Sequence, residues 1–234
     1  LTHTAVFCCL GSSRGAGFFL GFSFVLSPNL AADLVVRQLR HGHRRRRLRV
    51  LHLAEDSPAH QEEEANMQGW AAGIGAEDLE LIQKAGVLLL QREIPDWVNT
   101  QAAQAAKSAG VPVIMDAGGM DAPVPQDLLS LVDIFSPNET ELARLTGMPT
   151  ETFEQISQAA GECHKMGVKE VLVKLGSQGS ALFVEGEKPV RQPIIPATEV
   201  IDTTGAGDTF TSAFAVALVE GKSKEECMRF AAAA

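Results

Sequence analysis

Short, almost wholly apolar segments alternate with stretches of helical spacing over most of this chain, and that alternation limits the fold more than any other feature. Three such segments are residues 87–90, 111–115 and 170–175. An apolar run without polar alternation is typical of a strand that is buried on both faces of a parallel sheet. We therefore predict an α/β fold, with a doubly wound, mostly parallel sheet, helices on both faces in three αβα layers, and right-handed crossovers.

The individual elements follow from periodicity and from start and stop residues. Helices are expected at 77–85, 95–108, 126–132, 138–146, 152–166 and 209–219, with a last one capped by Ser223 and Glu226. Strands are expected at 87–90, 111–115, 134–136, 170–175, 180–184, 190–195 and 199–201, with 170–175 and 180–184 forming a hairpin. Because ligands bind beyond the carboxyl ends of parallel strands, binding residues are expected in the turns that follow these strands.

Residues 1–64 do not share this pattern. Residues 1–54 hold eight arginines against one aspartate, whereas the remainder carries 12 basic and 28 acidic side chains. We expect 1–64 to be a disordered basic segment and 65–234 to form the folded domain. The acidic body argues against nucleic acid as a partner. The apolar run at 16–26 is too short to cross a membrane, so no membrane partner is expected.

The four cysteines, Cys8, Cys9, Cys163 and Cys227, show no spacing typical of a metal site or of a disulfide framework. An intracellular, reducing compartment is therefore expected. Residues 1–54 are rich in arginine, contain serine and are poor in acidic residues, as in a transit segment. The plastid is thus an alternative to the cytoplasm.

The stretch Asp202-Thr-Thr-Gly-Ala-Gly-Asp-Thr-Phe210 carries the clearest chemistry. The glycines allow a sharp turn into a helix, and the free N–H groups of Gly205, Ala206 and Gly207 then form an anion hole. Asp208 at its mouth is placed to take a proton from a substrate hydroxyl while a phosphoryl group is transferred. The alternative is that Asp208 only caps the helix. No Lys-Ser/Thr pair follows, as in a Walker loop, and the third glycine of a dinucleotide fingerprint is lacking.

A second stretch, Ser136-Pro-Asn-Glu-Thr-Glu141, follows the strand expected at 134–136. Asn138 at the N-cap and Glu141 three residues later form the pattern of a capping box. That structural role is compatible with a binding role, because a capped helix end is also a rigid platform for ligands.

Both stretches resemble the motifs of the ribokinase (PfkB-type) family of carbohydrate kinases. Gln91-Arg-Glu-Ile-Pro95 and Thr140-Glu-Leu-Ala-Arg-Leu-Thr-Gly147 extend the resemblance, which covers roughly 65–234 and is closest to plant-type members. The resemblance implies a sugar kinase that uses ATP, Mg²⁺ and a monovalent cation such as K⁺. The implied reaction converts D-ribose to D-ribose 5-phosphate, with Asp208 as the base. A homodimer is one assembly that the resemblance allows.

The resemblance also implies roles for further residues. Asn138 would bind the phosphate end of ATP, and Glu141 would hold Mg²⁺ through water. Glu93 would contact the sugar together with Asp208, although a solvated charge at a strand end is an equal alternative. Asp202 and the carbonyl of Thr204 would bind the monovalent cation. The nucleotide site would be lined by Lys174, Gly176, Ser177, Gln178 and Gly179, whose glycines alone also fit an ordinary hairpin turn.

Nothing in residues 1–64 resembles the beginning of a ribokinase. The family begins with a sugar-binding strand, a glycine-rich loop and a β lid, so the domain is expected to be truncated and without the lid. An inactive chain is one expectation that follows. Two alternatives stay open. In the first, the substrate is another sugar, such as fructose, a ketodeoxygluconate or a nucleoside. In the second, the chain is a non-catalytic module that binds a nucleotide or a partner.

Overall fold

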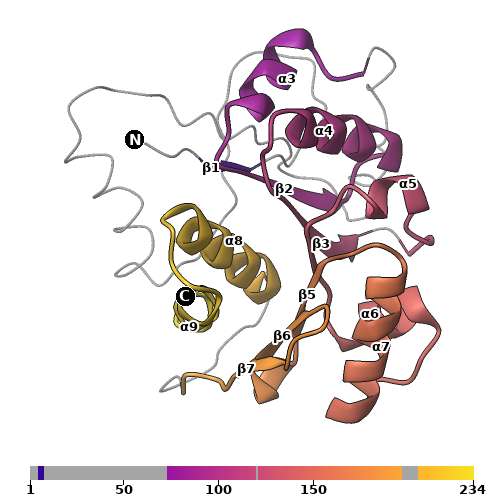
Figure 1. The fold of residues 1–234 in the computed structure, drawn as a ribbon, viewed down its shortest axis with the longest axis vertical. Coiled ribbons are helices and arrows are strands. Elements are labelled where there is room, and N and C mark those ends of the chain that lie inside the picture. The colour runs from indigo at the N-terminus through magenta and orange to yellow at the C-terminus, as the bar shows by residue number, and fades with distance from the viewer. Residues whose placement is uncertain (1–4, 8–72, 120, 197–204) are drawn as a thin grey trace, which may run out of the picture.

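Seven strands form one sheet in the computed structural model, which describes residues 5–7, 73–119, 121–196 and 205–234 (Figure 1). The strands lie side by side in chain order. They are β1 Ala5–Phe7, β2 Val87–Arg92, β3 Val113–Gly119, β4 Ile134–Ser136, β5 Glu170–Lys174, β6 Ser180–Val184 and β7 Val190–Gln192. The first five strands pair in parallel, and β6 and β7 are added antiparallel. The predicted mostly parallel sheet and its hairpin are confirmed.

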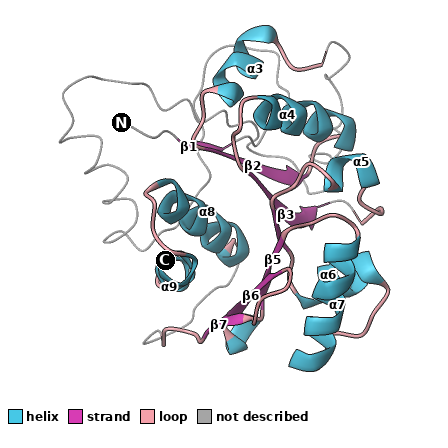
Figure 2. Ribbon diagram, viewed as in Figure 1, coloured by secondary structure: helices cyan, strands magenta, loops and turns pink. Residues whose placement is uncertain are grey.

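Helices cover both faces of this sheet (Figures 1 and 2). On one face lie α3 Ala76–Gln83, α4 Asp96–Ser108, α5 Gln126–Leu129, α6 Glu139–Thr146 and α7 Phe153–Lys165. On the other face lie α8 Ala206–Val219 and α9 Lys224–Ala232. Each face has its own apolar core. Leu88 and Leu90 of β2 belong to the core under α3–α7, whereas Val87 packs with Phe214 of α8. Successive residues of a strand point to opposite faces, so an apolar strand serves both cores.

Four element boundaries differ from the predicted ones by three residues or more. β3 continues through Gly119, where the sequence suggested a turn, because its end pairs with Arg92 after a register shift. α5 ends at Leu129, and β7 ends at Gln192 instead of running to 195. Helix α8 begins at Ala206, three residues earlier than predicted. The strand predicted at 199–201 lies outside the described residues.

Three helices begin with a reciprocal capping box, and the sequence analysis predicts two of these boxes, at Asn138 and Ser223. The N-caps are Asn138, Thr152 and Ser223, and each side chain accepts a hydrogen bond from the backbone N–H three residues on. The third residue of each helix returns a bond to the N-cap backbone, which satisfies two N–H groups without intrahelical partners. These starts depend on neighbours in the sequence, which explains why they were predictable.

Strand β1 comes from the segment 1–64, in which the sequence shows no strand alternation. The structure pairs Ala5–Phe7 in parallel with residues 87–89 of β2. The rest of this segment, residues 1–4 and 8–64, lies outside the described residues. Its predicted disorder and the predicted boundary between 64 and 65 therefore stay predictions. Among the helices that the structure describes, none has the length and apolar character required to span a bilayer.

Candidate active site

The first turn of α8 carries the glycine-rich stretch. Gly205 is the N-cap and adopts the left-handed conformation, with φ 72° and ψ 4°, which glycine tolerates without a Cβ clash. The N–H of Thr209 donates to the carbonyl of Gly205 at 2.9 Å and closes the first helical turn. The N–H groups of Ala206, Gly207 and Asp208 precede that bond and therefore have no acceptor within the helix. Free N–H groups and the helix dipole favour an anion at this point.

Asp208 is the third residue of α8 and does not cap it, so the alternative of a capping aspartate is wrong. Its Oδ1 accepts a hydrogen bond from Nε2 of Gln91, at the end of β2, at 2.7 Å. Burial of the half-buried carboxyl raises its pKa, and so does the nearby Asp116, while Lys174 and Gln91 act in the opposite direction. A carboxylate with a raised pKa is a stronger base, which suits proton abstraction from a hydroxyl.

Lys174, the last residue of β5, brings a positive charge to the same turn. Its Nζ lies 2.6 Å from Oδ2 of Asp116, and both side chains are largely buried. A Cβ built on Gly207 would lie 3.4 Å from that Nζ, so the ammonium group lies against the first turn of α8. Asp116 also accepts from Oγ1 of Thr211 at 2.7 Å and from the N–H of Gly118 at 3.1 Å. The carboxylate of Asp116 thus accepts from three donors, one of which is the ammonium group of Lys174.

Asn138 and Glu141 form the capping box of α6, as one of the two interpretations predicts. The N–H of Glu141 donates to Oδ1 of Asn138 at 2.9 Å, and the N–H of Asn138 donates to Oε2 of Glu141 at 2.7 Å. The other oxygen of Glu141 faces the site, because a Cβ on Gly118 would lie 3.7 Å from Oε1 and 3.4 Å from Oδ1 of Asp116. Burial raises the pKa of Glu141.

The residues present fit a magnesium ion that is held mainly by water and by the phosphates of the substrate. In the described part of the chain, no three acidic, histidine or cysteine side chains lie close enough to hold a metal by themselves. Mg²⁺ usually keeps several waters and takes one or two carboxylates plus the phosphates of the substrate. Oε1 of Glu141, which faces the site from a rigid helix start, is one such carboxylate.

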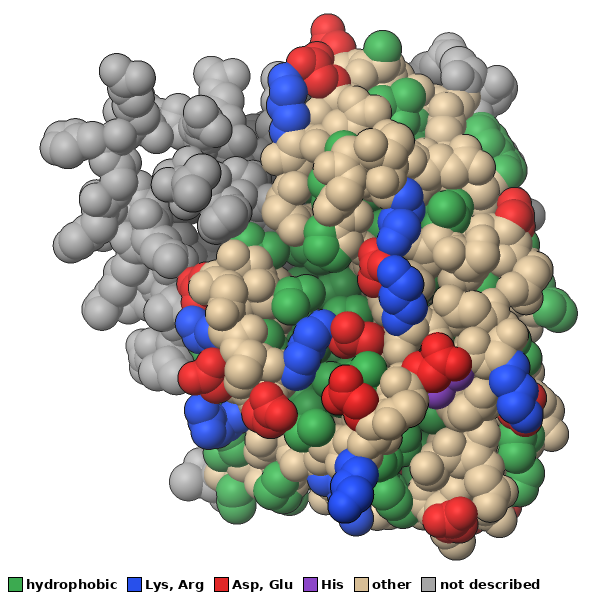
Figure 3. Space-filling model, in the orientation of Figure 1, with side chains coloured by type: hydrophobic (Ala, Val, Ile, Leu, Met, Phe, Trp, Pro, Cys, Tyr) green, Lys and Arg blue, Asp and Glu red, His purple; other side chains and the backbone are tan. Residues whose placement is uncertain are grey.

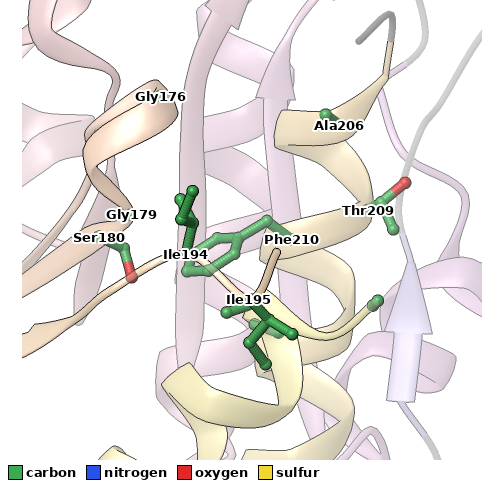
Figure 4. Close-up of a pocket in the computed structure, with 11 residues that line it drawn as sticks. Gly176, Gly179, Ser180, Ile194, Ile195, Ala206, Thr209 and Phe210 are labelled. Carbon is green, nitrogen blue, oxygen red and sulfur yellow. The ribbon is translucent and has the colours of Figure 1, made fainter. Parts of the chain in front are cut away.

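A pocket of about 360 Å³ opens between the turn after β5 and the start of α8 (Figure 4). Gly176 and Gly179 of the turn line it, as predicted for the nucleotide site, whereas Ser177 and Gln178 are exposed and do not. The other lining residues are Ser180, Ile194, Ile195, Ala206, Thr209, Phe210, Ala231, Ala232 and Ala234. The walls are therefore mostly apolar or backbone, which suits a flat ring better than a charged group.

Of the remaining predicted site residues, the structure describes only Glu93. Glu93 is exposed just beyond the end of β2. Asp202 and Thr204 lie outside the described residues. Figure 3 shows Lys and Arg side chains lying singly among Asp and Glu side chains on the face it presents.

Three residues in the site had no role in the sequence prediction, namely Gln91, Asp116 and Thr211. Gln91 and Asp116 lie toward the carboxyl ends of neighbouring parallel strands, so the rule that placed the other site residues would have found them. Thr211 is three residues after Asp208 in α8, and nothing in the sequence distinguishes it from a helix residue without a role.

Comparisons with known proteins relate most of the chain to carbohydrate kinases. A family model described as pfkB family carbohydrate kinase matches residues 53–234. The chain is 70% identical over 170 residues to a ribokinase of Arabidopsis thaliana, covering 73% of the chain and 45% of that protein. It is 37% identical to a ribokinase of Haemophilus influenzae, covering 65% and 49%. The chain thus spans about half the length of these curated relatives.

Two solved structures have the same fold. The Arabidopsis thaliana ribokinase complexed with ribose and ATP gives a TM-score of 0.72 at 70% identity, over 73% of this chain and 55% of the other. A ribokinase from Thermotoga maritima gives 0.58 at 34% identity, over 67% and 51%. The predicted ribokinase-like fold is confirmed.

Proposed function

The chain belongs to the pfkB family of carbohydrate kinases, and on this premise we propose that it transfers the γ-phosphoryl group of ATP to D-ribose, forming D-ribose 5-phosphate. The similarity to proteins named ribokinase, one of them solved with ribose and ATP, supports this substrate pair. The observation that carries the proposal is a half-buried carboxylate, Asp208, in the first turn of a helix whose first N–H groups have no acceptor within the helix.

The proposed mechanism uses each group for one task. Asp208 takes the proton of the sugar hydroxyl as its oxygen attacks phosphorus. The N–H groups of Gly205 to Asp208 stabilise charge on the transferring phosphoryl oxygens. The Lys174 ammonium adds a positive charge beside them, 2.6 Å from Asp116 in this structure. Glu141 would hold Mg²⁺ through water and Asn138 would bind the phosphate end of ATP, where the ion would supply further charge neutralisation on the phosphates.

The ligands are expected on opposite sides of the first turn of α8. The apolar pocket beside Gly176 and Gly179 is proposed for the base of ATP, with the phosphates directed towards α8. The sugar is proposed on the side of Gln91 and Asp208, where β2 ends and Glu93 follows. K⁺ bound by Asp202 and Thr204, a homodimer, and a cytoplasmic or plastid location all stay proposals from the sequence.

A coupled assay of ADP release, run on this chain with a panel of sugars, tests the proposed function. Turnover with ribose well above that with fructose, ketodeoxygluconate or nucleosides is the expected result. A higher rate with one of those would change the substrate but keep the class. Because the chain spans about half of its relatives, a non-catalytic nucleotide-binding module is the second candidate. Protection by ATP against unfolding without phosphorylation of any sugar would favour it.

Replacing Gly207 with alanine is expected to weaken ATP binding by about tenfold while leaving the fold intact. The new methyl group would lie among the free N–H groups, but only 3.4 Å from the flexible end of Lys174, which can move. Calorimetric titration with Mg·ATP measures the loss, and thermal unfolding checks the fold. Gly75→Ala is the matched control, since its Cβ would also lie 3.4 Å from a side-chain atom at a helix start, away from the site. Equal affinities for the variant and wild-type chains would contradict the anion hole.

Replacing Lys174 with methionine is expected to lower ATP affinity by roughly 10–100-fold, the loss typical of a hydrogen bond to a charged group. It should also raise the pKa of Asp208 further, because Lys174 opposes the effects of burial and of Asp116. Since only the ionised carboxylate accepts a proton, the acid limb of the kcat profile should move to higher pH.

The control is Lys107→Met, which breaks an ion pair of similar length, 2.7 Å to Asp133, outside the site. It should change stability alone. An unchanged ATP affinity in the Lys174 variant would argue against a phosphate-binding role.

A further inference from the structure

Gln91, in β2, forms a hydrogen bond to the proposed base, Asp208, in α8. Its Nε2 donates to Oδ1 of Asp208 at 2.7 Å, between residues 117 positions apart in the chain. Both side chains are half-buried. A carboxylate has two oxygens, and a donor on Oδ1 leaves Oδ2 to receive the proton of a substrate. The bond therefore determines which oxygen, and which direction, is available for the reaction.

The backbone of Gln91 is itself anchored. Nδ2 of Asn99, a fully buried residue in α4, donates to the carbonyl of Gln91 at 2.8 Å. Oδ1 of Asn99 has no hydrogen-bond partner among the described residues. A buried amide with an unsatisfied oxygen costs stability, and the nitrogen of this amide bonds to the backbone of Gln91, as a positional task requires.

The residue after Gln91 fixes the same strand end from its other side. Arg92 is buried, with 3% of its surface exposed, and its guanidinium pairs with Asp96 at 2.7 Å. It also donates to the carbonyls of Ala122 at 2.5 Å and Pro123 at 3.2 Å. The end of β2 is thus tied to α4 and to the segment after β3, which restricts the movement of the Gln91 side chain.

The charges around Asp208 explain why an uncharged donor is suited to this place. Two carboxylates approach from β3 and α6, Asp116 and Glu141, and one ammonium group from β5, Lys174. Burial and Asp116 raise the pKa of Asp208, and Lys174 and Gln91 lower it. An amide donor stabilises the ionised form without adding a charge that would compete with Lys174 for the phosphates.

We propose that Gln91 is a positioning residue for phosphoryl transfer, which orients the Asp208 carboxylate and keeps it ionised, with Asn99 holding Gln91 in place. The catalytic part of this proposal rests on the proposed function. The contact itself does not, because the structure shows it directly.

Two substitutions separate this role from packing. Gln91→Glu has almost the same shape, so a residue needed only for packing would tolerate it better than Gln91→Leu. If Gln91 serves as a donor, Gln91→Glu is the worse of the two, since adjacent carboxylates cannot both be ionised. We expect kcat at neutral pH to fall by roughly tenfold or more in Gln91→Glu and less in Gln91→Leu. In both variants, KM for ATP should stay nearly constant. The acid limb of the kcat profile should shift to higher pH by about one unit.

A readout without turnover uses ¹³C-labelled aspartate carboxyl groups in the full chain, with the Asp208 signal assigned from an Asp208→Asn variant. NMR titration should show a higher midpoint for Asp208 in Gln91→Leu than in the wild-type chain, and a smaller rise in Asn99→Leu. Gln158→Leu is the matched control, since Gln158 donates to Glu154 at 3.2 Å on the exposed surface of α7. That variant should leave the Asp208 midpoint unchanged.

The outcomes distinguish the two proposals. A shifted Asp208 midpoint in a chain that phosphorylates no sugar would support the contact and its electrostatic effect, while the kinase proposal would fail. An unshifted midpoint in Gln91→Leu would overturn the proposal for Gln91. The proposal for Gln91 would also be overturned if the wild-type chain is active and the Gln91→Glu variant has a normal kcat.

Discussion

Replacing Asp208 with asparagine is expected to lower kcat by roughly 10²–10⁴-fold, the usual contribution of a general base. Asparagine keeps the shape and an oxygen that accepts from Gln91, but it does not take a proton from the sugar hydroxyl. ATP affinity should be retained or increased, because a negative charge is removed from a site that also holds Asp116 and Glu141. Steady-state kinetics and calorimetric titration with ATP measure the two effects separately.

The matched control for this substitution is Asp78→Asn. Asp78 is the third residue of α3, a helix that also begins after a glycine N-cap, so both aspartates stabilise a helix dipole in the same way. A role limited to helix stability predicts similar small effects for both variants. Near-normal turnover in the Asp208 variant would remove the base from the mechanism, whatever the control shows.

Replacing Gly179 with alanine is expected to destabilise the protein by roughly 3–5 kcal/mol. Gly179 has φ 90° and ψ −127°, a conformation that residues with a Cβ rarely adopt. A Cβ there would lie 2.1 Å from the carbonyl oxygen of Gln192 and 2.9 Å from backbone atoms of Pro193. Those are main-chain atoms, so the hairpin and the turn at 176–179 must shift. Urea unfolding followed by circular dichroism measures the loss.

Gly161→Ala provides the opposite expectation from the same chemical change. Gly161 lies inside α7, and a Cβ there meets nothing within 4 Å. Alanine is a better helix former, so stability should rise by about 0.5–1 kcal/mol. A Gly179 variant as stable as the wild-type chain would show that the turn between β5 and β6 adapts, and that the close approach of β7 is not required.

The predictable features are those that neighbouring residues decide. The capping box of Asn138 and Glu141 needs four consecutive residues, and the glycine turn into α8 needs a similar number. The boundaries that were wrong depend on distant partners. β3 runs on to Gly119 because Arg92 of β2 pairs with it, which no local pattern of residues 116–119 indicates.

The sequence by itself determined the class of fold, the helix starts at Asn138 and Ser223 and the identity of the proposed base, since periodicity, capping and a glycine turn act over a few residues. Only the tertiary structure decided what surrounds that base. Gln91 reaches Asp208 across 117 positions, and Lys174 reaches Asp116 across 58. Such pairs form where parallel strands end side by side, and their energy depends on burial and distance, which exist only once the sheet has formed.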